Sequence, residues 1–263
     1  MNKELVDGII LIISCQKHRE TRLKKFRLPD NQYGKWNVIY VIGDLFLDSE
    51  CKMDGNIMWI KCEDSYIHLL KKLALAIKYV YELYDIKEGI LRSGDDLIFN
   101  VNILESFLNM QNKPEFLGRS PRMRGLDAVD ITENLLRETT NDSFMVNYYS
   151  QHMEDFNNPQ HNLTGVNISK YKKRPKIPIG PSGVLYYISN RCCKILVDHM
   201  ETIHYDIFHF DHKTQSYPYT IEDCAVSYIM YTNYISFTHV DDMFSEFPNN
   251  NTIGYHTNEY KYK

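Results

Sequence analysis

The chain has 263 residues, of which 43% are hydrophobic and 13% aromatic, so it can build a packed core, and disorder over most of its length is excluded. Its formal net charge of −4 argues against a general electrostatic affinity for nucleic acid or for anionic membranes. The composition favours a folded protein whose partner is small or neutral.

Cysteine spacing and the N-terminus point to a reducing compartment. The six cysteines have no CxxC spacing, so neither a zinc site nor a disulfide framework is expected, and we predict reduced, mostly buried thiols. The apolar run at residues 9–13 is too short for a membrane span and follows acidic residues, unlike a signal peptide. We therefore expect a cytoplasmic protein, in the host cytoplasm if the source is a virus.

The first third of the chain has the order of a β-α-β unit. Residues 8–14, 37–43 and 56–61 are predicted strands, and residues 17–27 have helical composition. A long helix is predicted over residues 65–84, capped by Ser65, because apolar residues recur there with 3.6-residue spacing. Alternating strands and helices predict an open α/β sheet.

Residues 89–99 are the most informative segment. Two apolar runs flank Ser93-Gly94-Asp95-Asp96, which places adjacent carboxylates at the exposed end of a buried strand. Hard divalent cations prefer such oxygen ligands, and they bind phosphates in turn. A solvated turn is the alternative for this sequence taken alone.

The second half of the chain is less regular at first. Residues 114–176 are interpreted as loops and insertions on the same sheet, and order returns with a strand near residues 180–189 and a helix over 191–203. Strand-like pieces follow at 234–239 and 252–256. The whole pattern predicts one α/β domain with a mixed, mostly parallel central sheet flanked by helices.

Seven short motifs, in the same order along the chain, resemble those of the β-1,3-galactosyltransferase and Fringe group of glycosyltransferases, especially its soluble microbial or viral members. They are Arg19-Glu-Thr-Arg22, Val38-Ile-Tyr-Val-Ile-Gly43, Asp64-Ser-Tyr66, Arg92-Ser-Gly-Asp-Asp96, Ser182-Gly183 with Tyr187 and Ser189, Glu222-Asp223, and Ile253-Gly-Tyr-His256. The resemblance implies a single GT-A domain over residues 1–263, with the nucleotide sugar bound by residues 1–112 and the acceptor and catalysis assigned to residues 113–263.

Two positions depart from that family's pattern. Gly94 stands where the first aspartate of an acidic triplet is usual, so a contact to the donor ribose or to metal-bound water is missing or is supplied elsewhere. Cys224 replaces a valine of similar volume, and we expect that change to be harmless.

The resemblance implies a divalent cation, Mn²⁺ or Mg²⁺, as a Lewis acid on the diphosphate of the donor. Asp96 is the first expected ligand and His256 the second, while Asp95 contacts the metal through water or orients the donor. His239 is the reserve ligand. The plain alternative makes Asp96 a cap of the next segment and His256 a surface residue near the terminus.

The resemblance also assigns the residues of the acceptor side. Asp223 is expected to take the proton of the acceptor hydroxyl, with Glu222 beside it, although the two roles could be exchanged. Acidic residues at a helix N-terminus are also favoured by the helix dipole alone. Ser182 and Gly183 would let the acceptor approach the backbone, which is compatible with a simple turn.

The donor is expected to meet four basic residues. Arg22, in preference to Arg19, matches phosphate oxygens, because a guanidinium can donate two parallel hydrogen bonds. A solvated helix face is the alternative for both. Lys72 joins the set through the resemblance, although its place near the polar side of the long helix also suits a solvated lysine, and Arg92 would support the acidic pair electrostatically.

The sequence thus predicts a metal-dependent inverting glycosyltransferase that moves a sugar from a nucleotide sugar, a UDP-sugar first, to a hydroxyl of a glycan or glycoconjugate. One alternative is a glycan-binding protein on the same fold whose altered triplet has abolished turnover. Another is a nucleotidyl- or phosphoryl-transfer enzyme that uses Asp95 and Asp96. A glycosyltransferase acting on DNA bases is a further alternative, because residues 170–176 form a basic run.

Overall fold

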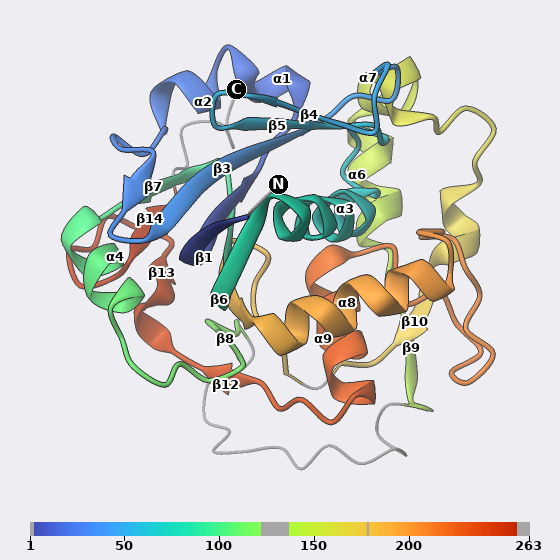
Figure 1. The fold of residues 1–263 in the computed structure, drawn as a ribbon. Coiled ribbons are helices and arrows are strands. Elements are labelled where there is room, and N and C mark those ends of the chain that lie inside the picture. The colour runs from blue at the N-terminus through green and yellow to red at the C-terminus, as the bar shows by residue number, and fades with distance from the viewer. Residues whose placement is uncertain (1–2, 122–136, 178, 257–263) are drawn as a thin grey trace.

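The computed structural model describes residues 3–121, 137–177 and 179–256, and it is built around one large twisted sheet (Figure 1). Its strands are β1 (Glu4–Ile13), β2 (Gln32–Tyr33), β3 (Trp36–Gly43), β4 (Cys51–Asp54), β5 (Ile57–Ile60), β6 (Tyr84–Gly94), β8 (Phe116–Gly118), β11 (Leu185–Ser189) and β12 (Thr238–His239). Smaller sheets are formed by β9 (Thr139–Asn141) with β10 (Lys173–Pro175), and by β7 (Leu97–Phe99), β13 (Phe244–Ser245) and β14 (Gly254–His256).

Helices surround this sheet. They are α1 (Gln16–Arg19), α2 (Arg22–Lys25), α3 (Leu69–Leu83), α4 (Val101–Leu108), α6 (Phe144–Gln151), α7 (Met153–Phe156), α8 (Asn190–Thr202) and α9 (Glu222–Thr232), with the 3₁₀ turns η1 (Pro159–His161), η2 (Ile168–Tyr171) and η3 (Asp241–Met243). In the described ranges, no helix has both the length and the apolar character needed to cross a bilayer.

The sheet runs in the order β12-β8-β11-β6-β1-β3-β5-β4, with β2 added beside β3. The central strands β6, β1, β3 and β5 are parallel, whereas β11 and β4 join them antiparallel on either side. The predicted mixed α/β sheet flanked by helices is therefore confirmed. Because β1 and β6 are parallel neighbours, their carboxyl ends open at the same edge.

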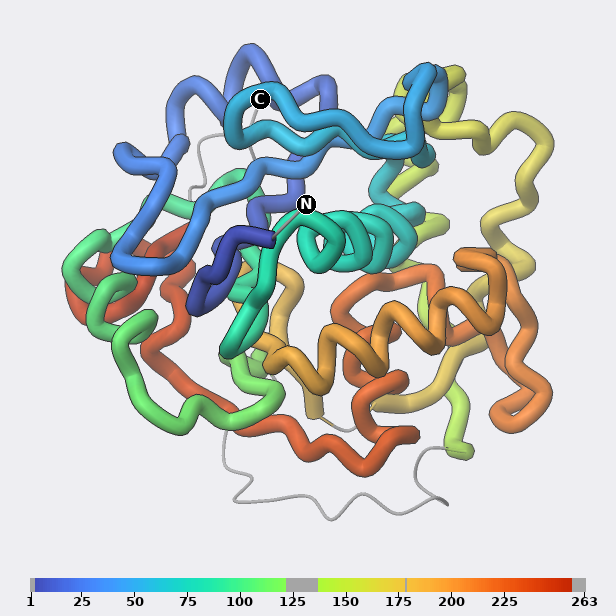
Figure 2. The backbone as a smooth tube through the Cα atoms, viewed as in Figure 1, coloured from blue at the N-terminus to red at the C-terminus, as the bar shows by residue number. Residues whose placement is uncertain are grey.

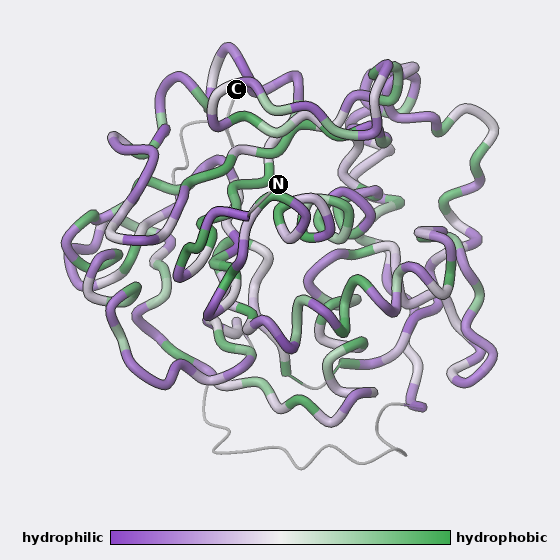
Figure 3. The backbone as a smooth tube through the Cα atoms, in the orientation of Figure 1, coloured by the Kyte–Doolittle hydropathy of each residue, from purple (hydrophilic) through white to green (hydrophobic). Residues whose placement is uncertain are grey.

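The central strands are buried on both faces, as the β-branched runs predicted. Along β1, Ile9 and Leu11 pack on one side of the sheet, while Ile10 and Ile12 pack on the other. The first side is covered by α3, α8 and α9, which pack against one another, and the second is covered by α4 (Figure 2). The hydropathy of the backbone follows this layering, with apolar colour along the central strands (Figure 3).

The long helix begins later than its sequence predicts. Ser65 does accept a hydrogen bond from the backbone N–H of His68, at 3.3 Å, but this bond closes a turn and α3 starts only at Leu69. Tyr66 falls within the predicted helix, yet it lies in that turn and is 42% exposed. The local competition of a serine hydroxyl for backbone N–H groups explains the shift.

Other differences are small in extent. The predicted helix at residues 17–27 is two short helices, α1 and α2. Strand β4, which was not predicted, pairs with β5 through a turn at Gly55 with φ of +60°. The segment interpreted as loops, residues 114–176, contains β8, β9, β10, α6 and α7, and residues 122–136 of it lie outside the described part of the chain.

Gly89 on β6 is predicted to tolerate no side chain. Its φ is +154°, and a Cβ atom would lie 2.2 Å from the carbonyl oxygen of Ile188 on β11. We expect Gly89→Ala to lower the free energy of unfolding by at least about 2 kcal/mol, because the contact is with backbone that cannot rotate away. At Gly55 an added Cβ would meet open space, and only the backbone strain at its φ of +60° would count. Gly55→Ala should therefore lower the free energy of unfolding by about 1 kcal/mol. Urea unfolding of both variants, followed by circular dichroism, checks this difference, and equal losses would contradict it.

Candidate functional site

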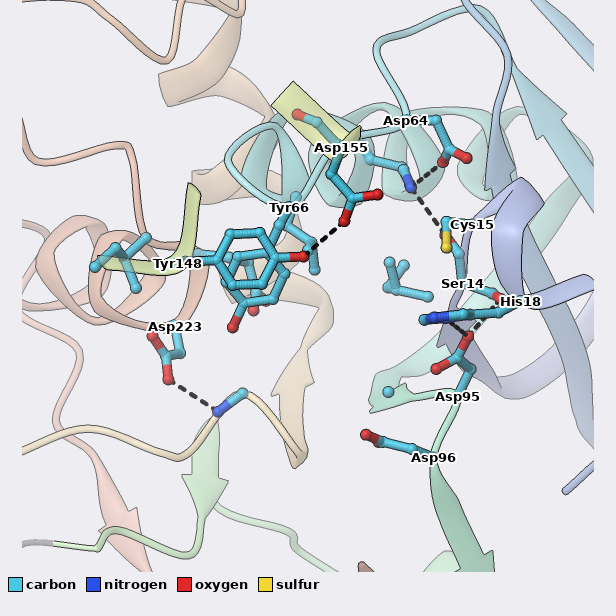
Figure 4. Close-up of a pocket in the computed structure, with 18 of the residues that line it drawn as sticks. Ser14, Cys15, His18, Asp64, Tyr66, Asp95, Asp96, Tyr148, Asp155 and Asp223 are labelled. Carbon is cyan, nitrogen blue, oxygen red and sulfur yellow. Dashed lines mark hydrogen bonds and ion pairs between the residues drawn. The ribbon is translucent and has the colours of Figure 1, made fainter. Parts of the chain in front are cut away.

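A cavity of about 540 Å³ opens where β1 and β6 end (Figure 4). Its wall combines the segments after these two strands with the turn before α3, helix α6, the loop before β11, the start of α9 and the end of β14. The residues that the sequence predicted for the site line this cavity, with the exception of Arg19 and of the reserve ligand His239. Segments that are far apart in the chain are thus brought together, as expected at the carboxyl edge of an open α/β sheet.

Asp95 joins three side chains at the edge of the cavity. Its Oδ2 accepts a hydrogen bond from the hydroxyl of Ser14 at 2.6 Å and lies 2.8 Å from Nδ1 of His18. Its Oδ1 accepts a hydrogen bond from Arg22 at 3.1 Å. The parallel register pairs Ile13 with Gly94, so Ser14 and Asp95, the residues that follow the two strands, lie next to each other at the edge of the sheet.

This network fixes the charges of its members. Burial would lower the pKa of His18, but the hydrogen bond and the charge of Asp95 outweigh it, with a contribution from Cys15, and raise that pKa to about 9. Burial would raise the pKa of Asp95, but His18, Ser14 and Arg22 hold it below its usual range. At neutral pH the pair is therefore an imidazolium beside a carboxylate.

Asp96 meets His256 because of the register of the small sheet. Strand β14 runs antiparallel to β7 and pairs His256 with Leu97, the residue next to Asp96. Nε2 of His256 lies 3.0 Å from Oδ2 of Asp96, and its Nδ1 lies 3.3 Å from a carboxylate oxygen of Glu246. Although burial would raise the pKa of Asp96, His256 and then Arg22 lower it. The two residues predicted as first and second metal ligands are adjacent.

His239, the reserve ligand, lies elsewhere. Its Nδ1 accepts a hydrogen bond from the backbone N–H of Ser120 at 3.0 Å, and its Nε2 lies 2.9 Å from Asp241, outside the cavity. Across the described residues, no three His, Cys, Asp or Glu side chains gather as a metal site. Asp96 and His256 would therefore be two protein ligands of a cation that completes its shell with other oxygens.

Lys72 is buried and not solvated. Its side chain is 2% exposed, and Nζ donates to the carboxylate of Asp64 and, at 2.8 Å, to the carbonyl of Ser14. Burial lowers the pKa of Lys72, but the charge of Asp64 outweighs it and the pKa is raised. Asp64 also accepts backbone N–H groups from Gln16 at 2.7 Å and Gly43 at 3.0 Å. This pair ties α3 to the ends of β1 and β3 beneath the cavity.

Arg92 pairs with Glu222 and not with the acidic pair, contrary to the sequence-based expectation. One of its nitrogens lies 3.0 Å from Glu222, and another donates to the carbonyl of Gly183. Tyr186 donates to the second oxygen of Glu222. Glu222 is 7% exposed, and burial raises its pKa despite the charge of Arg92. Both of its oxygens are engaged inside the protein.

Asp223 is half-buried and faces the cavity at the start of α9. Its oxygens accept hydrogen bonds from the backbone N–H groups of Gly183 at 2.9 Å and Cys224 at 2.8 Å. These bonds fix the carboxylate and leave lone pairs directed to the cavity. Ser182 lines the same wall, and its backbone N–H donates to the backbone carbonyl of Arg119 at 2.9 Å.

Arg19 does not reach the cavity. Its guanidinium lies 5.4 Å from the centre of the Trp59 ring and 3.8 Å from the carboxylate of Glu20. Arg22, at the start of the next helix α2, instead donates to Asp95 and to Asp96, the latter at 3.4 Å. The preference for Arg22 over Arg19 agrees with this geometry.

Sequence reasoning missed several residues of the wall. Ser14 and His18 follow β1, and they could have been found by assuming that β1 and β6 are parallel neighbours. Phe144 and Tyr148 come from α6, inside the segment interpreted as loops, and no short-range pattern places them here. Their position depends on how α6 packs.

A comparison with models of known protein families gives no match to this chain, and a search of curated proteins finds no relative. The residues and their geometry are therefore the grounds on which function is argued.

Removing the buried cation is expected to be costly. Lys72→Met leaves the Asp64 carboxylate buried without its partner, and we expect the free energy of unfolding to fall by about 3–5 kcal/mol. Lys78→Met, which breaks a half-exposed pair with Glu201, should cost less than about 1 kcal/mol. Urea titrations of both proteins provide the measurement, and a Lys72 variant as stable as the Lys78 variant would be the contrary result.

The His18 network predicts a pH dependence of stability in EDTA. The unfolded chain releases the His18 proton near pH 6.5, whereas the folded chain keeps it to about pH 9, so the folded state binds more protons between these values. Stability should fall as pH rises from 6.5 to 9, by up to about 3 kcal/mol. His18→Gln should flatten this slope, and exposed His212→Gln should not. Thermal melts across this range test it, and a wild-type profile as flat as that of His18→Gln would refute it.

Proposed function

We propose that this chain is a metal-dependent glycosyltransferase of the GT-A type. It would move a sugar, with inversion, from a nucleotide sugar to a hydroxyl of a glycan or glycoconjugate, and a UDP-sugar is the first donor to test. The observation that carries the proposal is one cavity with an acidic pair, Asp95 and Asp96, on one wall and a fixed carboxylate, Asp223, on another.

The residues around Asp96 fit a divalent cation. Two ligands on neighbouring corners of an octahedron of about 2.1 Å radius are about 3 Å apart, and Asp96 and His256 are separated by 3.0 Å. One carboxylate, one imidazole and phosphate or water oxygens suit Mn²⁺. The cation, when bound, would act as a Lewis acid that neutralises the charge of the departing diphosphate.

Arg22 supports the donor half of the proposal. Its guanidinium is held between Asp95 and Asp96 and lines the cavity, so a phosphate bound there would meet a fixed, always charged donor group. His18, as an imidazolium, adds a second positive charge to the same wall. Because Arg22 and His18 are paired with Asp95 and Asp96, this wall would offer hydrogen-bond donors to phosphates without a large net charge.

Asp223 supports the acceptor half. The attacking hydroxyl would form a bond to the anomeric carbon, its proton would pass to an oxygen of Asp223, and the bond from the sugar to the nucleoside diphosphate would break. The two backbone N–H groups hold the carboxylate in place without occupying all of its lone pairs. Glu222 is assigned a positioning role, since Arg92 and Tyr186 already bind its two oxygens.

Gly94 bears on the glycan-binding alternative. A Cβ atom at this position would lie 3.1 Å from Oδ1 of Asp96, so the absence of a side chain gives the Asp96 carboxylate its room. This spacing gives the glycine a steric reason that does not depend on whether the protein turns over a substrate. The alternative of a non-catalytic protein is then decided by measurement.

The test is a screen of UDP-, GDP-, CMP- and TDP-sugars for nucleotide release with Mn²⁺ and again with EDTA. We expect release from one donor with metal only, and Asp96→Ala should lower its rate at least ~100-fold, because the cation loses its first ligand. Asp241→Ala, an exposed carboxylate outside the cavity, is the matched control and should match the wild type.

Asp223→Asn separates chemistry from binding. It should bind the donor as the wild type does in calorimetry but transfer sugar at least ~100-fold more slowly to any acceptor found. Normal transfer by Asp223→Asn would remove this residue from the mechanism. No release from any donor, together with no nucleotide-sugar binding in calorimetry, would favour the glycan-binding alternative. Release of pyrophosphate or phosphate would identify a nucleotidyl- or phosphoryl-transfer enzyme.

A further inference from the structure

The cavity has one wall that the proposed chemistry does not use, formed by the rings of Tyr66, Phe144 and Tyr148. We name this wall the aromatic shelf. We propose that the aromatic shelf binds the pyranose ring of a neutral sugar, the acceptor, and presents one of its hydroxyls to Asp223. This inference rests on the proposed function and adds the class of acceptor.

The shelf is a fixed surface. The rings of Tyr66 and Tyr148 are stacked, with centroids 4.9 Å apart and planes inclined by 24°, and Phe144 lies 6.0 Å from Tyr66. His152 stacks on the other side of Tyr148 at 4.3 Å. The Tyr148 hydroxyl donates to Asp155 at 3.2 Å, which orients its ring. A pre-formed stack of this kind loses little freedom when a ligand is added.

The shelf exposes apolar area inside a cavity. Tyr66 is 42% exposed and Phe144 is 47% exposed, although both line the cavity and belong to ordered elements. Apolar area of this size, left uncovered in a concave site with a few polar groups around it, is typical of ligand pockets. The sugar rings of an acceptor have a face of C–H groups that can cover such area against the electron-rich face of an aromatic ring.

The shelf lies beside the proposed base. In Figure 4 the rings of Tyr66 and Tyr148 stand on the side of Asp223, across the cavity from Asp95, Asp96 and His18. Burial and then the charge of Asp223 raise the pKa of Tyr66 to about 12, so its hydroxyl stays protonated and can donate a hydrogen bond to a sugar oxygen. A ring on the shelf would thus be held next to the carboxylate that takes its proton.

The charges around the shelf select a neutral sugar. Asp142 and Asp155 line this end of the cavity in ion pairs with Arg174 and Lys17, and the carboxylate of Asp223, which can accept a hydrogen bond from a hydroxyl but repels a carboxylate or a phosphate, lines it as well. The guanidinium of Arg22, which suits a phosphate, is held instead by Asp95 and Asp96, across the cavity from Asp223 (Figure 4). The shelf therefore suits the acceptor better than the nucleotide.

Saturation-transfer NMR with three methyl pyranosides tests the proposal. The probes are methyl β-D-glucopyranoside, methyl β-D-galactopyranoside and methyl α-D-mannopyranoside, each added to the full chain with Mn²⁺ and UDP. We expect at least one of them to bind, and Tyr66→Ala and Phe144→Ala to weaken it at least ~10-fold, while Tyr66→Phe keeps the stack and loses less. Phe46→Ala, whose ring is 64% exposed outside the cavity, should bind like the wild type.

Each other outcome is informative. A wild-type chain that binds none of the three pyranosides, or shelf variants that bind them unchanged, overturns the inference. Shelf variants that lose affinity for UDP in calorimetry but keep the pyranosides would make the shelf a base-stacking surface and also overturn it. Metal-dependent donor release without an acceptor should stay within about two-fold of the wild type in Phe46→Ala, because that ring does not line the cavity.

The two proposals can fail separately. If the pyranoside binds the shelf but the wild-type chain neither releases nucleotide from any donor nor transfers sugar to the pyranoside, the shelf stands as a sugar-binding surface and the glycosyltransferase proposal falls. If donor release is metal-dependent but the shelf variants bind the pyranoside unchanged, the glycosyltransferase proposal stands and the inference about the shelf falls.

Discussion

The carboxylate of Asp95 joins two strands whose ends are about eighty residues apart in the chain, because it accepts hydrogen bonds from the segment after β1 while it sits at the end of β6. This contact needs a buried negative charge, which is tolerable only because His18 and Arg22 balance it. Asp96 is the next residue in the chain, so the same arrangement also fixes its position. The cavity therefore depends on one neutralised charge cluster at the sheet edge.

A second buried cluster, Arg92 with Glu222, holds the opposite wall. The backbone of Gly183 connects it to the cavity, since its carbonyl accepts from Arg92 and its N–H donates to Asp223. Both clusters draw on β6, since Arg92 lies on this strand and Asp95 directly follows it. Asp223 nevertheless lies across the cavity from Asp95 and His18, so the carboxylate fixed by the second cluster is kept apart from the first (Figure 4).

The sequence was enough to predict the central strands, because buried parallel strands have continuous β-branched runs, and to predict that Asp95 and Asp96 follow one of them. It also placed Glu222 and Asp223 at the start of a helix. It could not predict that Lys72 is buried, because Asp64, the partner of this lysine, meets it only once α3 packs against the strands. Tyr66 was misplaced for a related reason, since the hydrogen bonds of Ser65 decide where the helix begins.

The carboxylate of Asp64 has a consequence for the dynamics of the cavity. It accepts hydrogen bonds from the backbone N–H groups of Gln16 and Gly43, and it forms an ion pair with Lys72. These two amide hydrogens can therefore exchange with solvent only when the Asp64–Lys72 pair opens. The base of the cavity beneath β1 and β3 therefore opens only together with this buried pair. The aromatic shelf is braced by its own stack of rings, so the base and the shelf are held in place by independent interactions.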